Sequence, residues 1–108
     1  MRSLALAALF AVAMAGSGQA ADPAPVSITI KDRQFVPAEV TVPAGAKVEL
    51  KIRNEQTAAA EFESHQMRRE KVIPPGGTVS VFIGPLNPGR YEFFDDFNPK
   101  NRGVVVVK

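Results

Sequence analysis

The most informative segment of this chain reads Gly89-Arg-Tyr-Glu-Phe-Phe-Asp95-Asp96-Phe-Asn98-Pro-Lys-Asn-Arg-Gly103-Val-Val-Val-Val-Lys108. Its first part has a period of two, so Tyr91, Phe93 and Asp95 are predicted to share the inward face of one strand. The continuous apolar run at 104–107 predicts a closing strand inside the sheet pair, buried on both faces. The polar residues between the two predict a connecting loop.

Alternating apolar and polar residues predict further strands along the chain. The expected strands are 26–31, 39–42, 48–53, 60–64, 78–83, 90–94 and 104–108. Pro43-Ala44-Gly45 and Pro74-Pro75-Gly76-Gly77 supply turn signals. Together these patterns predict an all-β Greek-key sandwich or barrel of about seven strands. The segment Leu86 to Tyr91 predicts a corner in which the Tyr91 hydroxyl bonds nearby backbone, which gives Tyr91 a structural role.

The amino terminus has the pattern of a secretory signal. Met1-Arg2 is positive, an apolar stretch follows from Leu4 to Ala15, and Gly18-Gln19-Ala20 is a small-x-small cleavage site. A short membrane anchor is the alternative, but the apolar run is too short to span a bilayer. We therefore expect a signal peptide at 1–20, a flexible lead-in at 21–25 and one domain at 26–108. No cysteine follows the apolar run, which excludes a lipoprotein anchor and disulfides.

Composition and motifs narrow the functional classes. The formal net charge of the chain is +2, which gives no reason to propose nucleic acid or a membrane surface as a partner. No nucleophilic triad, phosphate loop or paired metal-ligand motif can be assembled, so a hydrolase is disfavoured. The chain is expected to be a monomer or weak dimer and no enzyme by itself.

Several motifs resemble one known family. Phe35-Val36-Pro37-Ala38-Glu39-Val40-Thr41-Val42-Pro43-Ala44-Gly45 and Leu50-x-Ile52-x-Asn54 resemble the opening of bacterial cupredoxin-like domains. The segments 61–64, 69–76 and 93–97 resemble the small periplasmic cupredoxin-like proteins that accompany ferrous-iron uptake permeases. They also resemble the amino-terminal domain of iron-transport proteins with an additional helical domain. The resemblance implies a periplasmic part in iron uptake, in which the protein binds, oxidises or hands over metal. Its implied partners are periplasmic or membrane components of that system.

The copper-ligand positions of a cupredoxin hold other residues in this chain. The resemblance places Glu61 at the first histidine, Asp95 at the thiolate, Asn98 at the second histidine and the distal methionine near Gly103. A blue-copper site needs two imidazoles and a thiolate, whereas this chain has one His and no Cys. An electron-transfer copper protein is therefore disfavoured.

Carboxylates offer a different metal site. Glu61 and Asp95 are expected to face each other at the top of the core, where two like charges would be costly without a cation. The further candidate ligands are Glu63, Asp96, His65 and Met67. Iron or manganese suits oxygen ligands, and Cu(II) would need nitrogen or sulfur from His65 and Met67.

A metal-free interpretation stays open. In it, Asp95 caps backbone amides of the following loop and Glu61 pairs with Lys100 or Arg102. Glu63, Asp96 and His65 are then surface groups, and Met67 is a core or rim residue. The domain would be an interaction module that docks onto a permease or another partner protein.

The signal pattern gives the first prediction. Exported protein should begin at Ala21, because the bond after Ala20 follows small residues at both required positions. Intact-mass measurement of exported protein checks this start. A mass that matches the full chain would contradict it.

Overall fold

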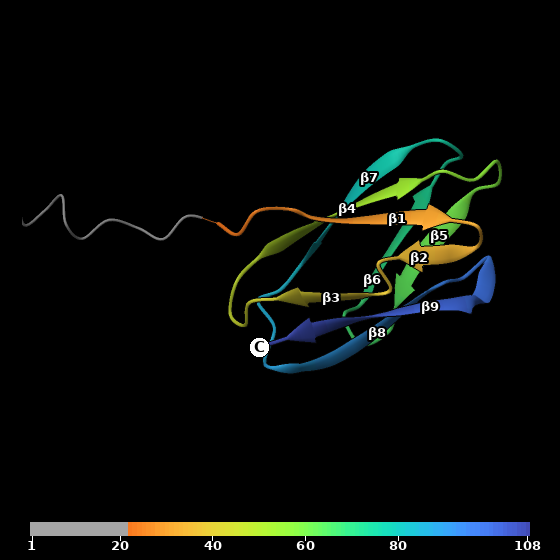
Figure 1. Ribbon diagram of the computed structural model, residues 1–108. Coiled ribbons are helices and arrows are strands. Elements are labelled where there is room, and N and C mark those ends of the chain that lie inside the picture. The colour runs from red at the N-terminus through yellow and green to blue at the C-terminus, as the bar shows by residue number, and fades with distance from the viewer. Residues whose placement is uncertain (1–21) are drawn as a thin grey trace, which may run out of the picture.

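The computed structural model describes residues 22–108 (Figure 1). The predicted signal peptide therefore lies outside the described residues. Residues 22–25 have no regular structure, and the first strand begins at Val26. Within 22–108 no helix has the length and apolar character needed to cross a membrane.

Strands in two sheets form the described part of the chain. They are β1 (Val26–Lys31), β2 (Gln34–Val36), β3 (Glu39–Val42), β4 (Val48–Asn54), β5 (Ala60–Ser64), β6 (Arg69–Ile73), β7 (Thr78–Ile83), β8 (Gly89–Asp95) and β9 (Asn98–Val107). One sheet has the order β2-β1-β4-β7 and the other the order β3-β9-β8-β5-β6. The pairs β1–β4 and β3–β9 are parallel, because the chain crosses between the sheets. The predicted all-β fold is confirmed.

The sequence pattern missed β2 and β6. β2 is only three residues long, so it offers too little alternation to recognise. β6 is an edge strand in which the first four residues are exposed and only Ile73 is buried. Edge strands of this kind carry polar side chains, which removes the periodic apolar signal.

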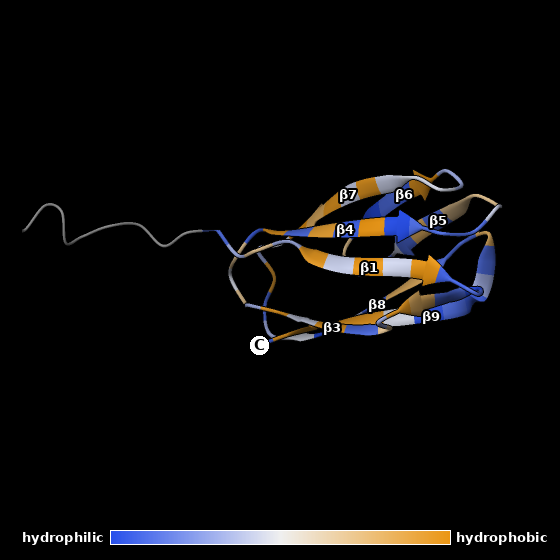
Figure 2. Ribbon diagram, turned by 45° about the horizontal axis from the view of Figure 1, so that its top comes forward, coloured by the Kyte–Doolittle hydropathy of each residue, from blue (hydrophilic) through white to orange (hydrophobic). Residues whose placement is uncertain are grey.

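The core fills the space between the sheets. Figure 2 shows apolar and polar residues alternating along β1 and β4, as the period of a half-buried strand requires. Phe93 of β8 lies at the centre, with the Phe35 ring edge-on at 4.8 Å and the Phe62 ring stacked at 5.0 Å. Phe35 belongs to one sheet and Phe62 and Phe93 to the other, so this aromatic group holds the two sheets together.

The predicted loop between the last two strands is much shorter in the structure. Only Asp96 and Phe97 form the turn, and β9 begins already at Asn98. The register then shifts from Asp95↔Asn98 to Phe94↔Arg102, so residues 99–101 form a bulge on β9. The apolar end of β9 lies between β3 and β8 as expected. Its outer face, however, is only half-buried at 104 and 106.

The corner before β8 has the predicted hydrogen bond. The Tyr91 hydroxyl donates to the carbonyl oxygen of Asn87 at 2.8 Å. This bond ties the start of β8 to the connection that precedes it, which is the contact expected of a structural Tyr91.

Gly103 stands where a side chain has no space. A Cβ atom added there would lie 2.6 Å from Cε1 of Phe93 and 2.7 Å from the Ala38 carbonyl oxygen. Gly103→Ala should therefore push on the central ring and destabilise the domain by about 1–3 kcal/mol. Chemical denaturation measures this loss. Gly76→Ala is the comparison, since that site is open and only its positive φ of 70° is strained. A G103A variant as stable as the wild type would contradict this packing.

Candidate functional site

Asp95 is buried, and one of its carboxylate oxygens is bonded to backbone. Its side chain is 3% exposed, and Oδ1 accepts hydrogen bonds from the backbone N–H of Glu61 at 2.9 Å and of Phe97 at 3.0 Å. The second bond is an Asx turn that caps the two-residue connection to β9. Asp95 therefore joins β5, the end of β8 and the following turn.

Glu61 does not present its carboxylate to Asp95. It lies on β5 between Ala60 and Phe62, both fully buried, so its side chain points to the outer face of the sheet. Asp95 contacts the backbone of Glu61, and its own side chain lies on the inner face, opposite Phe62 in register. The two carboxylates therefore lie on opposite faces of the sheet, and the expectation that they face each other is wrong.

Three other carboxylates meet on the outer face. Oxygen atoms of Glu61, Glu63 and Glu70 all lie within 4.8 Å of one another, and we call these residues the outer acidic cluster. Glu63 is directly opposite Glu70 in the pairing of β5 with β6. Sequence reasoning did not identify Glu70 as a candidate ligand. The strand β6 was not predicted, and no local signal shows which residue of another strand lies opposite Glu70.

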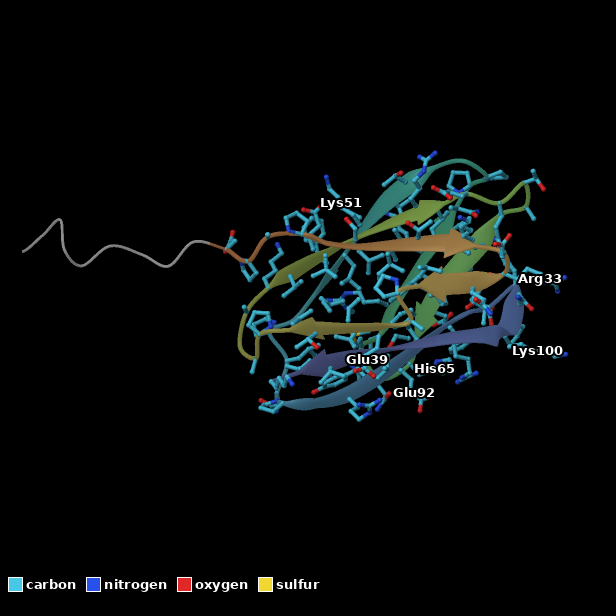
Figure 3. All side chains as sticks on the ribbon, in the orientation of Figure 1. Arg33, Glu39, Lys51, His65, Glu92 and Lys100 are labelled. Atoms are coloured by element: carbon cyan, nitrogen blue, oxygen red, sulfur yellow. The ribbon has the colours of Figure 1, made fainter. Side chains whose placement is uncertain are left out.

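Two of the expected ligands lie at the margin of the outer acidic cluster. The Asp96 backbone N–H donates to the Glu61 carbonyl oxygen at 2.9 Å, and the Asp96 carboxyl group adjoins that of Glu61. His65 Nδ1 lies 3.9 Å from Glu63 Oε2, and the His65 side chain is 81% exposed. Figure 3 shows His65 on the same side of the domain as Glu92.

The crowding of carboxylates changes their acidity. Desolvation raises the pKa of Glu61 above 4.5, followed by a hydrogen bond with Asp96 and repulsion from Glu70. Desolvation also raises the pKa of Glu63, followed by repulsion from Glu70. A raised pKa means that the folded chain binds these protons more tightly than the unfolded chain. The stability that the protonated groups contribute is therefore complete below pH 4.5 and is lost as the pH rises through the raised pKa values.

Met67 lies in the core and is not part of the outer acidic cluster. It is 6% exposed and belongs to the hydrophobic core, while its backbone N–H donates to Ser64 Oγ at 3.2 Å. Its place agrees with the core alternative. Within residues 22–108, Arg102 pairs with Glu92 at 3.4 Å, and neither Arg102 nor Lys100 pairs with Glu61. The expected ion pair of Glu61 is therefore wrong.

A blue-copper ligand set does not fit this domain. The chain has no Cys, and the residue at the thiolate position, Asp95, accepts two backbone hydrogen bonds. At Gly103, near the expected methionine position, the Phe93 ring and the Ala38 carbonyl occupy the space that a side chain would need. At these two positions, hydrogen bonds and packing stand where a copper protein would have ligands.

The two-sheet sandwich, its tyrosine corner and its closing hairpin define a cupredoxin-type domain. The chain belongs to the cupredoxin-like domain family, whose match covers residues 3–107. Two solved structures share the fold at low identity. The metal-binding domain of the Cu(I)-exporting P-type ATPase CopA of Streptococcus pneumoniae D39, determined with Cu(I), has a TM-score of 0.69 and 16% identity, covering 78% of this chain and 84% of that one. Amicyanin from Paracoccus versutus has a TM-score of 0.63 and 21% identity, and the match covers 80% of this chain and 84% of amicyanin.

Curated relatives are more similar in sequence. An uncharacterized protein of Rickettsia prowazekii (strain Madrid E) is 43% identical over 83 residues, which is 76% of this chain and 66% of that protein. The iron uptake system component EfeO of Yersinia pestis is 34% identical over 98 residues, 84% of this chain and 25% of EfeO. The EfeO of Escherichia coli (strain K12) is 32% identical over 110 residues, which is 97% of this chain and 28% of that EfeO. The chain thus spans about a quarter of the length of these EfeO proteins.

The buried carboxylate gives a prediction about stability. Asp95→Asn keeps the shape of the side chain but removes the charge that strengthens its two backbone hydrogen bonds. The variant should be about 1 kcal/mol less stable than the wild type in chemical denaturation. Asp96→Asn is the matched control, because Asp96 is exposed. An equal effect of both substitutions would contradict the role given to Asp95.

Proposed function

We propose that this protein is a periplasmic component of an iron-uptake system that binds a transition metal ion, iron or copper, at the outer acidic cluster. The observation that carries the proposal is the approach of the Glu61, Glu63 and Glu70 oxygen atoms to within 4.8 Å of one another. Similarity to EfeO over most of the chain supports the link to iron uptake. The periplasmic location rests on the signal pattern at residues 1–20.

The chemistry of the cluster favours a cation with oxygen ligands. Three carboxylates this close repel one another when ionised, and a bound cation would relieve the repulsion. Iron and manganese accept carboxylate ligands readily. Asp96 adds a further oxygen beside Glu61, and the exposed His65 supplies a nitrogen that would help to hold Cu(II).

The open position of the cluster suits transfer of the ion rather than its storage. The side chains of Glu61 and Glu63 are partly exposed and that of Glu70 is exposed, so an ion could exchange with solvent or with a partner without unfolding of the sheet. In this proposal Asp95 and Met67 support the site through β5 and the core and are not ligands. The exposure supports a role in handing metal over to periplasmic or membrane partners.

The proposal predicts a loss of metal binding in cluster variants. Glu63→Gln and Glu70→Gln should each weaken Fe(II) binding by at least roughly tenfold, since each removes one charged ligand. Anaerobic calorimetric titration measures the affinity, and parallel titration with Cu(II) identifies the preferred ion. Glu39→Gln is the control, because Glu39 is an exposed carboxylate on β3 that pairs with Arg90 at 3.4 Å outside the cluster.

The same titrations should depend on pH. Protons compete with the metal, so affinity should fall as the pH drops through the raised pKa values of Glu61 and Glu63, above the ordinary 4.5. Equal metal affinity of E63Q, E70Q and the wild type would contradict metal binding at the outer acidic cluster. No metal binding by any of these proteins would instead favour the metal-free interaction module, whose exposed apolar residues include Val72 and Phe97.

A further inference from the structure

A cationic cavity lies at the end of the sandwich where β1 turns into β2 and β9 begins. Its volume is about 610 Å³, and its lining includes Arg33, Lys100 and Arg102 with a single carboxylate, Asp32. Figure 3 shows Arg33 and Lys100 together at this end of the domain. With three cationic side chains and one carboxylate, the lining is predominantly positive, whereas the outer acidic cluster is negative.

The β1–β2 turn positions one of these cations. Asp32 and Arg33 both have left-handed backbone, with φ of 50° and 64°, as a two-residue hairpin turn requires. The Arg33 backbone N–H donates to Gln56 Oε1 at 3.1 Å, which ties the turn to the loop after β4. The position of Arg33 therefore depends on backbone contacts that a change of its side chain would leave in place.

Two of the three cations carry no compensating partner. Within residues 22–108, neither Arg33 nor Lys100 has a carboxylate within ion-pair distance. Arg102, by contrast, pairs with Glu92 and donates to the Pro99 carbonyl oxygen at 3.3 Å. Arg33 and Lys100 thus supply the charge that is available to a ligand in the cavity.

A buried donor in the lining adds an independent observation. Asn101 of the β9 bulge is 5% exposed, and its Oδ1 accepts a hydrogen bond from the Phe35 backbone N–H at 2.9 Å. Its Nδ2 is buried without an acceptor, the single such side-chain atom found in residues 22–108. An unmatched buried donor is costly, and native structures contain few of them. Asn101 also lines the cavity beside the uncompensated cations, so both observations favour an acceptor at this end of the sandwich.

We propose that the cavity binds a small oxyanion, a phosphate or a carboxylate. Arg33 and Lys100 offer charged donors to such a group, and guanidinium matches the geometry of both anions. The Asn101 side chain lines the same cavity, and a small turn of its amide would offer a neutral donor from β9. Nothing in this assignment depends on metal at the outer acidic cluster, so the two sites can be tested separately.

Nuclear magnetic resonance titration tests the proposal. Inorganic phosphate and, in a separate arm, citrate are added to isotope-labelled protein at constant ionic strength, with chloride as the reference salt. We expect saturable shifts of the Asn101 side-chain amide signals with at least one of the two anions, and the arms show which anion is preferred. Arg33→Gln and Lys100→Gln should each weaken this binding by roughly tenfold.

Lys51→Gln is the matched control. Lys51 is an exposed lysine on β4, away from Arg33 and Lys100 in Figure 3, and its loss changes the net charge equally without touching the cavity. K51Q should bind the anion as the wild type does. Shifts that never saturate, or an equal weakening in K51Q and R33Q, would overturn the proposal, because both results describe unspecific screening. Metal-site variants such as E63Q should leave anion binding unchanged.

Discussion

Where β8 turns into β9, one carboxylate oxygen of Asp95 accepts two backbone hydrogen bonds. One comes from Glu61 on β5 and the other from Phe97 in the turn to β9. Because the carboxylate is 3% exposed, these bonds replace the water that a charge would otherwise keep. They fix the pairing of β5 with β8 and close the hairpin in two residues. The positions of the outer carboxylates and of the β9 bulge both follow from this arrangement.

Successive side chains of β5 point alternately into the core and to the outer face of the sheet. Phe62 packs on Phe93 in the core, while Glu61 and Glu63 point outward and meet Glu70 of the neighbouring strand. The inward Asp95 carboxylate is matched by two backbone N–H groups. The outward acidic groups lie close together, and desolvation, followed by repulsion between them, raises the pKa of Glu61 and Glu63. The two proposals therefore assign a cation to the acidic outer face and an oxyanion to the cavity beside Arg33.

The elements that the sequence revealed are those with a buried face. β1, β4 and β7 alternate because one side of each strand meets the core, and the turn signals at 43–45 and 74–77 separate them from their neighbours. β2 and β6 were not recognised, because a three-residue strand and an exposed edge strand leave no periodic signal. Because β6 was not predicted, the nearness of Glu70 to Glu63 could not be foreseen. The expected approach of Glu61 to Asp95 also fails, since their side chains lie on opposite faces of the sheet.

The sequence by itself determined the all-β class, the inward face of β8, the corner at Tyr91 and the absence of a blue-copper ligand set. Each depends on residue identity or on a period of two, which local sequence contains. Only the tertiary structure decided which side chains share a surface. Cross-strand register brings Glu63 opposite Glu70, and the β9 bulge places Asn101 against Phe35, 66 residues away in the chain. Such contacts depend on strand pairing and on the direction in which each side chain points. Neither can be deduced from the spacing of residues along one segment.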